Sequence, residues 1–202
     1  MKLAEIIDTF ISGEWGNEIP SEDMPNAVFC VRGADIIPIS NNEYVNIPQR
    51  FISYKALKIK KLQAGDLVIE KSGGSPQQST GRIIYISNKL IQAKNNIVCS
   101  NFCTAIRVKS SWNSKYIYYL WQNIYNSGVF FNYEGKTSGI KNLQLENALT
   151  SIEINNISIE KQNKIVKILS NIDKKISINQ QINQNLPSLD HSSKVVVIRL
   201  AA

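Results

Sequence analysis

Residues 62–86, LQAGDLVIEKSGGSPQQSTGRIIYI, contain the clearest strand signals of the chain. They contain two short segments rich in apolar and β-branched residues, Leu67–Ile69 and Arg82–Ile86, with the length of strands. The connection from Ser72 to Gly81 is too rich in Gly, Ser, Pro and Gln to pack as an element, and too long for a tight hairpin. The stretch therefore predicts two strands joined by a loop.

Similar patterns continue on both sides of this stretch. Further strands are expected at Ala27–Arg32, Ile36–Ile39, Ile97–Cys99, Thr104–Val108 and Ile152–Ile154. Helical spacing of apolar residues predicts helices at Leu3–Ile11, from a capping Ser114 to Ser127, and near Leu143–Leu149. The mixture indicates an α+β fold with mixed or antiparallel strands.

A long helix is predicted near the C-terminus. Ser158 is a candidate N-cap, no Gly or Pro interrupts residues 159–186, and Pro187 ends the pattern, which gives a helix of roughly 40 Å. A coiled-coil-type seam runs along it, formed by Ile165, Leu169, Ile172, Ile176, Asn179, Ile182 and Leu186. An amphipathic helix lying on its own core is the alternative, but the length favours association of two helices, and so an antiparallel homodimer. The expected parts are a domain over residues 1–157, the helix over 158–186 and a tail over 187–202 that continues neither pattern.

Composition excludes several classes of protein. The chain has 202 residues, of which 43% are hydrophobic, enough to bury a core. It has no apolar run of membrane-spanning length and no secretory signal pattern. Three cysteines without a Cys-x-x-Cys pair and a single histidine argue against a disulfide scaffold or a zinc site. A reducing cytoplasm is therefore the expected location.

Positive charge is concentrated in one region. The net charge is +7, yet residues 1–49 carry two basic and eight acidic side chains, whereas residues 50–109 carry eleven basic and two acidic ones. Such a region fits a polyanion, because neutralised phosphates release counterions. The 22 Asn and 11 Gln residues fit base-edge recognition. The alternatives are a solvated lysine face and an amide content that reflects an AT-rich genome.

The parts of a catalytic site are missing from the sequence. There is no P-loop, dinucleotide-binding glycine turn, His-Glu-x-x-His or Gly-x-Ser-x-Gly. Asp66 and Glu70 lie on one face of a predicted strand, where they form either a metal pair or, as we favour, a turn cap at Asp66. We therefore predict a protein that binds without catalysing, with no cofactor and no metal.

Several stretches together resemble one family. They are Gly13–Gly16, Val31–Ile36, Leu62–Pro76, Gly81–Arg82, Asn101–Phe102, Thr137–Leu143 and the helix opening at Glu160–Val166. In this order they resemble one recognition half of the specificity subunit of type I restriction-modification enzymes. Two features depart from the pattern: Asn155–Asn156 replaces the usual prolines before the long helix, and the tail 187–202 resembles nothing in the repeat.

The resemblance implies a function and partners. It implies a target recognition domain that reads half of a bipartite site in double-stranded DNA, and a spacer helix that pairs with another helix. Catalysis in that family belongs to separate methyltransferase and restriction subunits, which would be the partners. The alternatives are an interaction adaptor, or a truncated remnant that occupies the methyltransferase without productive DNA reading, and an enzyme whose acidic cluster forms only in three dimensions.

The loop between the two central strands is the predicted DNA-contacting segment. The residues expected to hold phosphate or read bases are Lys71, Ser72, Ser75, Gln77, Gln78, Thr80 and Arg82. The alternative is that this loop supports the fold, while bases are read near Asn41–Tyr54 or Lys109–Ser114.

Overall fold

The computed structural model places residues 1–73, 78–137 and 140–185. The chain divides into two compact units, Met1–Asn163 and Lys164–Ala202. Among the described residues, no helix has the length and apolar character needed to cross a bilayer. Ser75, Gln77, Leu186 and the tail 187–202, which carry predictions made above, lie outside the described residues.

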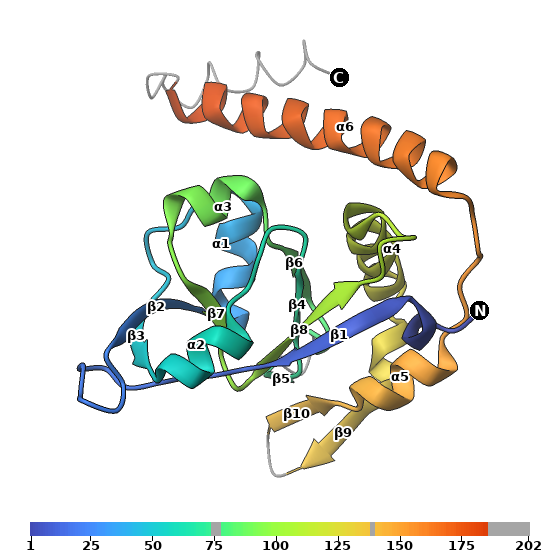
Figure 1. Cartoon of the computed structure of the whole chain (residues 1–202). Coiled ribbons are helices and arrows are strands. Elements are labelled where there is room, and N and C mark those ends of the chain that lie inside the picture. Colours follow the sequence, from blue (N-terminus) through green and yellow to red (C-terminus); the bar gives the residue numbers. More distant parts are fainter. Residues whose placement is uncertain (74–77, 138–139, 186–202) are drawn as a thin grey trace. The chain divides into compact units, whose positions relative to one another are not determined.

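A four-stranded antiparallel sheet forms the centre of the first unit (Figure 1). Its strands are β1 (Ile7–Ser12), β8 (Cys103–Val108), β4 (Leu67–Glu70) and β6 (Ile83–Tyr85), in that spatial order. The two strands predicted within residues 62–86 are confirmed, and they pair directly, with Val68 opposite Ile84. The strand predicted at Thr104–Val108 is confirmed as β8, which pairs with both β1 and β4.

Both faces of this sheet are covered, which explains why β4 reads as an unbroken apolar run. Leu67 and Ile69 face a cluster that contains Trp121 and Phe130, whereas Val68 faces a second cluster with Val31 and Ile39. Alternation along the strand sends neighbouring side chains to opposite faces, so both sets must be apolar when both faces are buried. The central strand is therefore fixed between two cores.

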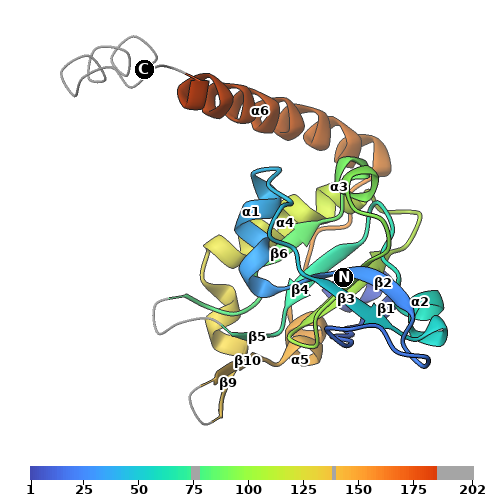
Figure 2. The ribbon, with the colours of Figure 1, turned by 90° about the vertical axis from the view of Figure 1, so that its left-hand side faces the viewer.

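The remaining strands form two three-stranded sheets (Figure 2). One has the order β3 (Gln49–Ile52), β2 (Asn26–Val31), β7 (Ile97–Cys99), in which β2 runs antiparallel to β3 and parallel to β7. The other has the order β5 (Ser72–Gly73), β10 (Ile140–Leu143), β9 (Glu134–Thr137). These mixed and antiparallel sheets, with helices packed on them, confirm the predicted α+β class.

Short helices surround the sheets. They are α1 (Ile36–Ser40), α2 (Tyr54–Lys60), α3 (Asn88–Ala93), α4 (Ser114–Asn126) and α5 (Leu145–Ser151), with 3-10 turns at Leu3–Ile6, Gly33–Asp35 and Val129–Tyr133. The helix α4 buries Trp121, whose ring stacks on Phe130 at 4.8 Å and whose Nε1 donates to the Gly81 carbonyl at 2.7 Å. This contact ties α4 to the end of the predicted loop.

Two predicted elements are wrong in type. The expected helix Leu3–Ile11 is a 3-10 turn followed by strand β1, which pairs along its length with β8. Ile7 and Ile11, four positions apart, are both buried, and this spacing between apolar residues fits a helix as well as a strand. The expected strand Ile36–Ile39 is the helix α1, which buries Ile36 and Ile39 and exposes Ile37.

Two smaller expectations are also corrected. The predicted strand Ile152–Ile154 makes only an isolated bridge, between Glu153 and Lys2. The cap of α4 is Asn113 rather than Ser114, because the Asn113 Oδ1 accepts hydrogen bonds from the Lys115 and Tyr116 amides at 2.9 and 3.2 Å. An Asn side chain caps as well as Ser does, so neighbouring candidates compete for the position.

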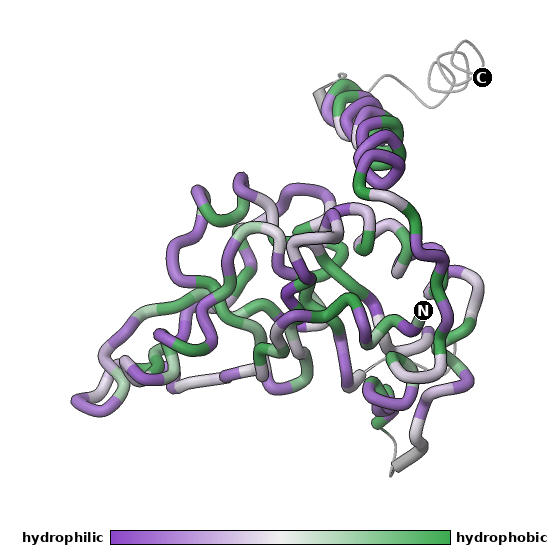
Figure 3. Tube along the Cα trace, turned by 45° about the vertical axis from the view of Figure 1, so that its right-hand side comes forward, coloured by the Kyte–Doolittle hydropathy of each residue, from purple (hydrophilic) through white to green (hydrophobic). Residues whose placement is uncertain are grey.

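The long helix is present as α6 (Ile159–Asn185). The Ser158 Oγ accepts a hydrogen bond from the Lys161 amide at 3.5 Å, in the expected capping position. Hydrophobic residues recur along a mostly polar helix (Figure 3). Of the predicted seam, Ile165 and Leu169 are half-buried, Asn179 is exposed, and Ile172, Ile176 and Ile182 are 48%, 50% and 52% exposed.

Candidate nucleic-acid interface

The beginning of the predicted DNA-contacting segment is held by main-chain bonds. The amides of Lys71 and Ser72 both donate to the Phe102 carbonyl, at 2.8 and 3.1 Å. The Ser72 hydroxyl also bonds the Asn142 side chain, across the β5–β10 pair. Lys71 and Gln78 are half-buried, and the Gln78 carbonyl accepts from the Lys141 ammonium at 3.4 Å.

The end of the segment is buried among charged partners. Thr80 is fully buried, and its amide and hydroxyl both donate to the Glu134 carboxylate at 2.6 and 3.1 Å. Arg82 forms a two-bond pair with Glu70, at 2.8 Å from Nε and 2.6 Å from Nη2. The bond to Glu70 raises the pKa of Arg82 above its ordinary value. These partners favour a structural role for both residues, and their contact with DNA stays a prediction.

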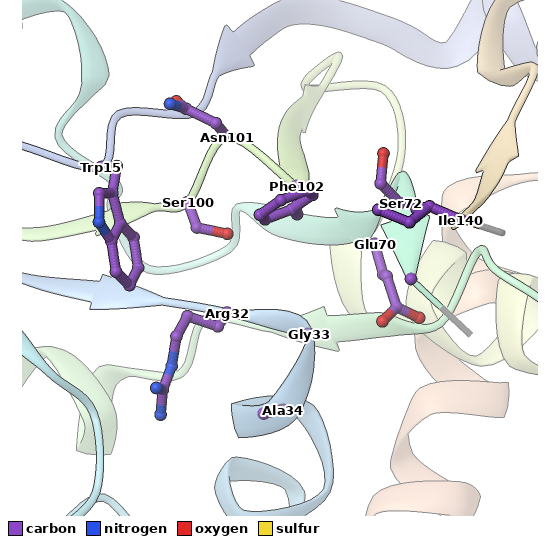
Figure 4. Close-up of a pocket in the computed structure, with 11 residues that line it drawn as sticks. Trp15, Arg32, Gly33, Ala34, Glu70, Ser72, Ser100, Asn101, Phe102 and Ile140 are labelled. Atoms are coloured by element: carbon purple, nitrogen blue, oxygen red, sulfur yellow. The ribbon is translucent and has the colours of Figure 1, made fainter. Parts of the chain in front are cut away.

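A pocket of about 570 Å³ opens beside β5 (Figure 4). Its lining comes from five segments that are far apart in sequence: Trp15, Arg32–Ala34, Glu70 with Ser72–Gly73, Ser100–Phe102 and Ile140. Each segment overlaps a stretch that carries the family resemblance. The fold therefore gathers these separate stretches around a single cavity.

Two glycines and a carboxylate shape the floor of this pocket. A Cβ atom on Gly33 would lie 2.4 Å from the Glu70 Oε1, and one on Gly73 would lie 3.0 Å from the same atom. Gly73 also has φ of +137°, a conformation that side-chain-bearing residues rarely adopt. The glycines let the Glu70–Arg82 pair pack closely and keep the cavity open above it.

The walls of the pocket are mainly apolar. The rim carries Phe102 and Ile140, which are 58% and 52% exposed. Trp15 is half-buried, and the Arg50 guanidinium lies over its ring, 4.1 Å from the centroid. Arg32 also lines the pocket and is paired with Asp35 through two bonds of 2.9 and 2.8 Å. The two buried carboxylates near the cavity, Glu70 and Asp35, are thus each paired with an arginine.

The basic region of residues 50–109 divides into paired and unpaired cations. Four of its eleven basic side chains bind carboxylates: Arg50 to Glu18, Lys60 to Glu14, Arg82 to Glu70 and Arg107 to Asp66. Among the described residues, no carboxylate pairs with the other seven. Those seven lysines, rather than the three arginines and Lys60, are the charges that remain to meet a polyanion.

One exposed stripe of these cations follows the helix α2. Lys55 and Lys58 are exposed and lie three positions apart on the helix, and Lys61 follows at its end. Tyr54 is beside them and is 74% exposed. The Lys61 ammonium bonds the Asn96 side chain at 2.7 Å. We call Tyr54, Lys55, Lys58 and Lys61 the α2 stripe.

Asp66 and Glu70, the carboxylates that the sequence offered as a metal pair or a turn cap, each bind an arginine. Both Asp66 oxygens bind Arg107, at 2.8 and 2.9 Å, and one also accepts from the Gln63 amide at 2.8 Å, which confirms the turn cap. The described residues contain no group of three or more His, Cys, Asp or Glu side chains that could hold a metal.

Sequence reasoning missed the most concentrated part of the site. Trp15, Asn101 and Phe102 stood within the resembling stretches but were not selected as site residues. Their only sequence signal was membership of the resembling stretches, and nothing in the sequence indicated that these separate segments meet. The α2 stripe had a clearer signal, the spacing of Lys55, Lys58 and Lys61.

Comparison with known proteins decides the family. Residues 33–188 match the family model of the type I restriction modification DNA specificity domain. The chain belongs to this family. A search of curated proteins gives no match.

Solved structures of specificity subunits share the fold of this chain. The type I restriction-modification S subunit from M. genitalium matches with 15% identity over 92% of this chain and 42% of its own, at a TM-score of 0.56. A structure reported on complex assembly and conformational transition of the type I R-M system is 16% identical over 99% of this chain and 42% of its own, at a TM-score of 0.58. The HsdS subunit from Thermoanaerobacter tengcongensis is 16% identical over 90% of this chain and 38% of its own, at a TM-score of 0.51. The specificity-domain chain thus spans about two fifths of the length of these structures.

Proposed function

We propose that this specificity-domain protein is a non-catalytic, sequence-specific DNA-binding subunit of a type I restriction-modification system. It reads one half of a bipartite site in double-stranded DNA and docks methyltransferase subunits, and the restriction subunit is a further partner. The observation that carries the proposal is the match of residues 33–188 to the DNA specificity domain. The seven unpaired cations of residues 50–109 support it, because they supply the phosphate-binding charge that any duplex contact needs.

The α2 stripe is proposed as part of the phosphate-binding surface. Its lysines are exposed and have no carboxylate partner among the described residues, so contact with DNA does not require breaking an ion pair. Lys71 and the other predicted loop residues are proposed as contacts closer to the bases. Thr80 and Arg82 would reach DNA only if their partners Glu134 and Glu70 released them.

Salt dependence of duplex binding tests this proposal. The logarithm of the binding constant should fall linearly with the logarithm of salt concentration, by about 0.9 for each phosphate neutralised. Lys55→Ala and Lys58→Ala should each lower affinity for all sequences alike and reduce that slope by about 1. Lys2→Ala is the matched control, because Lys2 already pairs with Glu153 at 2.8 Å. A salt-independent affinity would reject the DNA-binding function.

The second candidate function is an adaptor, or truncated remnant, that occupies the methyltransferase without productive DNA reading. The observation that favours it is the apolar surface of α6, where Ile172, Ile176 and Ile182 are about half exposed and available to a partner helix. Such a chain would bind a methyltransferase subunit and show no salt-dependent affinity for duplex. The salt experiment therefore separates the two candidates.

A further inference from the structure

We propose that the pocket between Trp15 and Phe102 binds one unstacked nucleobase. The proposal rests on the DNA-binding function above and adds a ligand for a cavity that this function does not itself assign. At about 570 Å³ the pocket falls within the range of roughly 300–1,000 Å³ that is typical of small-molecule sites.

The aromatic walls suit a flat heterocycle. In the view of Figure 4, the rings of Trp15 and Phe102 lie on either side of Ser100, above Arg32 and Gly33. Bases that leave a helix are commonly held by stacking on aromatic side chains. Phe102 is 58% exposed although it is a large apolar residue, so a ligand that covers it would remove apolar surface from water.

The Trp15 ring is already held in place before any ligand arrives. The Arg50 guanidinium lies 4.1 Å from its centroid, and Arg50 in turn pairs with Glu18 at 2.7 Å. The Arg50 Nε is buried and finds no acceptor among the described residues, which is a cost that the stack on Trp15 helps to offset. A fixed indole loses little freedom on binding, and this favours stacking with a planar ring.

One polar group at the pocket is free to read a base edge. Among the described residues, none forms a hydrogen bond with the Asn101 side-chain amide, and Asn101 is exposed. An amide offers one acceptor and a donor group on one edge, the pattern that pairs with an adenine edge. The neighbouring charges do not oppose this, because Glu70 is bound by Arg82 and Asp35 by Arg32.

A duplex with one unpaired base provides the direct test with the whole chain. The probe pair is a bulged duplex and the fully paired duplex of the same sequence. An unpaired base avoids most of the cost of leaving the stack, so we expect the bulged duplex to bind about tenfold more tightly. Tryptophan emission should be quenched by the bulged duplex and not by the paired one, and Trp15→Phe should remove that quench, because Trp112 and Trp121 are buried.

Surface variants locate the effect. Phe102→Ala and Asn101→Ala change exposed side chains, so the fold should survive, and each should abolish most of the preference for the bulged duplex while leaving affinity for the paired duplex unchanged. Phe10→Ala is the matched control, since Phe10 is 54% exposed on β1 and does not line this pocket.

Each outcome decides between the two proposals. Paired-duplex binding with no preference for the bulge overturns the nucleobase pocket and leaves the DNA-binding function in place. A preference that persists in both Phe102→Ala and Asn101→Ala also overturns it. Loss of binding to a methyltransferase subunit in these variants, without any change in bulge preference, would assign the pocket to protein docking instead. Failure to bind either duplex rejects both proposals.

Discussion

At the scale of single residues, the buried Glu70–Arg82 pair is the feature with the largest expected effect. Their side chains are 3% and 16% exposed, so removing one partner leaves a charge without compensation. Glu70→Gln and Arg82→Ala should each lower the free energy of unfolding by about 3 kcal/mol in urea titrations. The exposed pair Lys2–Glu153 gives the control, and Lys2→Ala should cost less than about 1 kcal/mol. If Arg82→Ala keeps full stability but loses affinity for every duplex, Arg82 is a phosphate contact after all.

The three cysteines give a pH prediction at the same scale. Burial raises the pKa of Cys30 to about 12 and that of Cys103 to about 11, and it raises the pKa of Cys99 as well. The unfolded thiols lose their protons first, near pH 8.5, so the unfolded state binds fewer protons and stability falls as pH rises above that value.

The measurement is the free energy of unfolding between about pH 7.5 and 9.5. Cys30→Ala should lose less stability over this interval than the unchanged chain. In the folded chain at pH 8, a thiol reagent should react slowly with the cysteines and should react fast only after denaturant is added. Fast labelling without denaturant would contradict the burial of these thiols.

At the scale of elements, the first turn of α6 is clasped to the start of α4. Gln162 is 1% exposed; its Oε1 accepts from the Asn113 amide at 2.8 Å, and its Nε2 donates to the Ile157 carbonyl at 3.0 Å. The Asn113 Nδ2 also donates to the Asn163 Oδ1 at 2.8 Å. One asparagine therefore caps α4 and binds the first turn of α6, within the first unit.

We expect Gln162→Ala to lower the free energy of unfolding of the first unit by about 1–3 kcal/mol, because it removes a buried side chain and leaves the half-buried Asn113 amide without its acceptor. Lys161→Ala, an exposed neighbour, should change it by less than about 0.5 kcal/mol. Chemical denaturation followed by the emission of the buried Trp112 and Trp121 measures both. Equal effects of the two variants would mean that the clasp does not hold α6.

A helix or strand can be predicted from the sequence when its signals lie within its own segment, and not when it depends on pairing with a distant segment. The strands β4 and β6 and the helices α4 and α6 were predictable, because the spacing of their apolar residues and the turn or capping residues at their ends lie within one segment. The strand β1 was not, because its partner strand β8 lies about a hundred residues away and, of its own residues, only Ile7 and Ile11 are buried, so no alternation is visible. The pocket was unpredictable for the same reason, since Trp15, Asn101 and Ile140 meet only through long-range pairing.

At the scale of the whole molecule, the exposed seam of α6 leads to a prediction about assembly. Ile172, Ile176 and Ile182 are about half exposed, and burying such side chains contributes roughly 1.5–3 kcal/mol each before entropy is subtracted. We propose that two chains pair antiparallel along residues 159–186, which would give two recognition domains and favour a two-part, inverted DNA site. Sedimentation equilibrium at micromolar concentration should show a dimer that Ile172→Lys combined with Ile176→Lys dissociates. A monomer, or a dimer unaffected by these changes, would contradict this assembly.

Selection of bound duplexes from a random pool measures whether this specificity-domain protein reads DNA sequence. The selection is run with the chain alone and with a type I methyltransferase subunit present. We predict that both selections enrich one motif, and that the motif is repeated in inverted orientation at a fixed spacing if the chain is dimeric. A bound pool that stays random in both selections would contradict sequence reading by this protein.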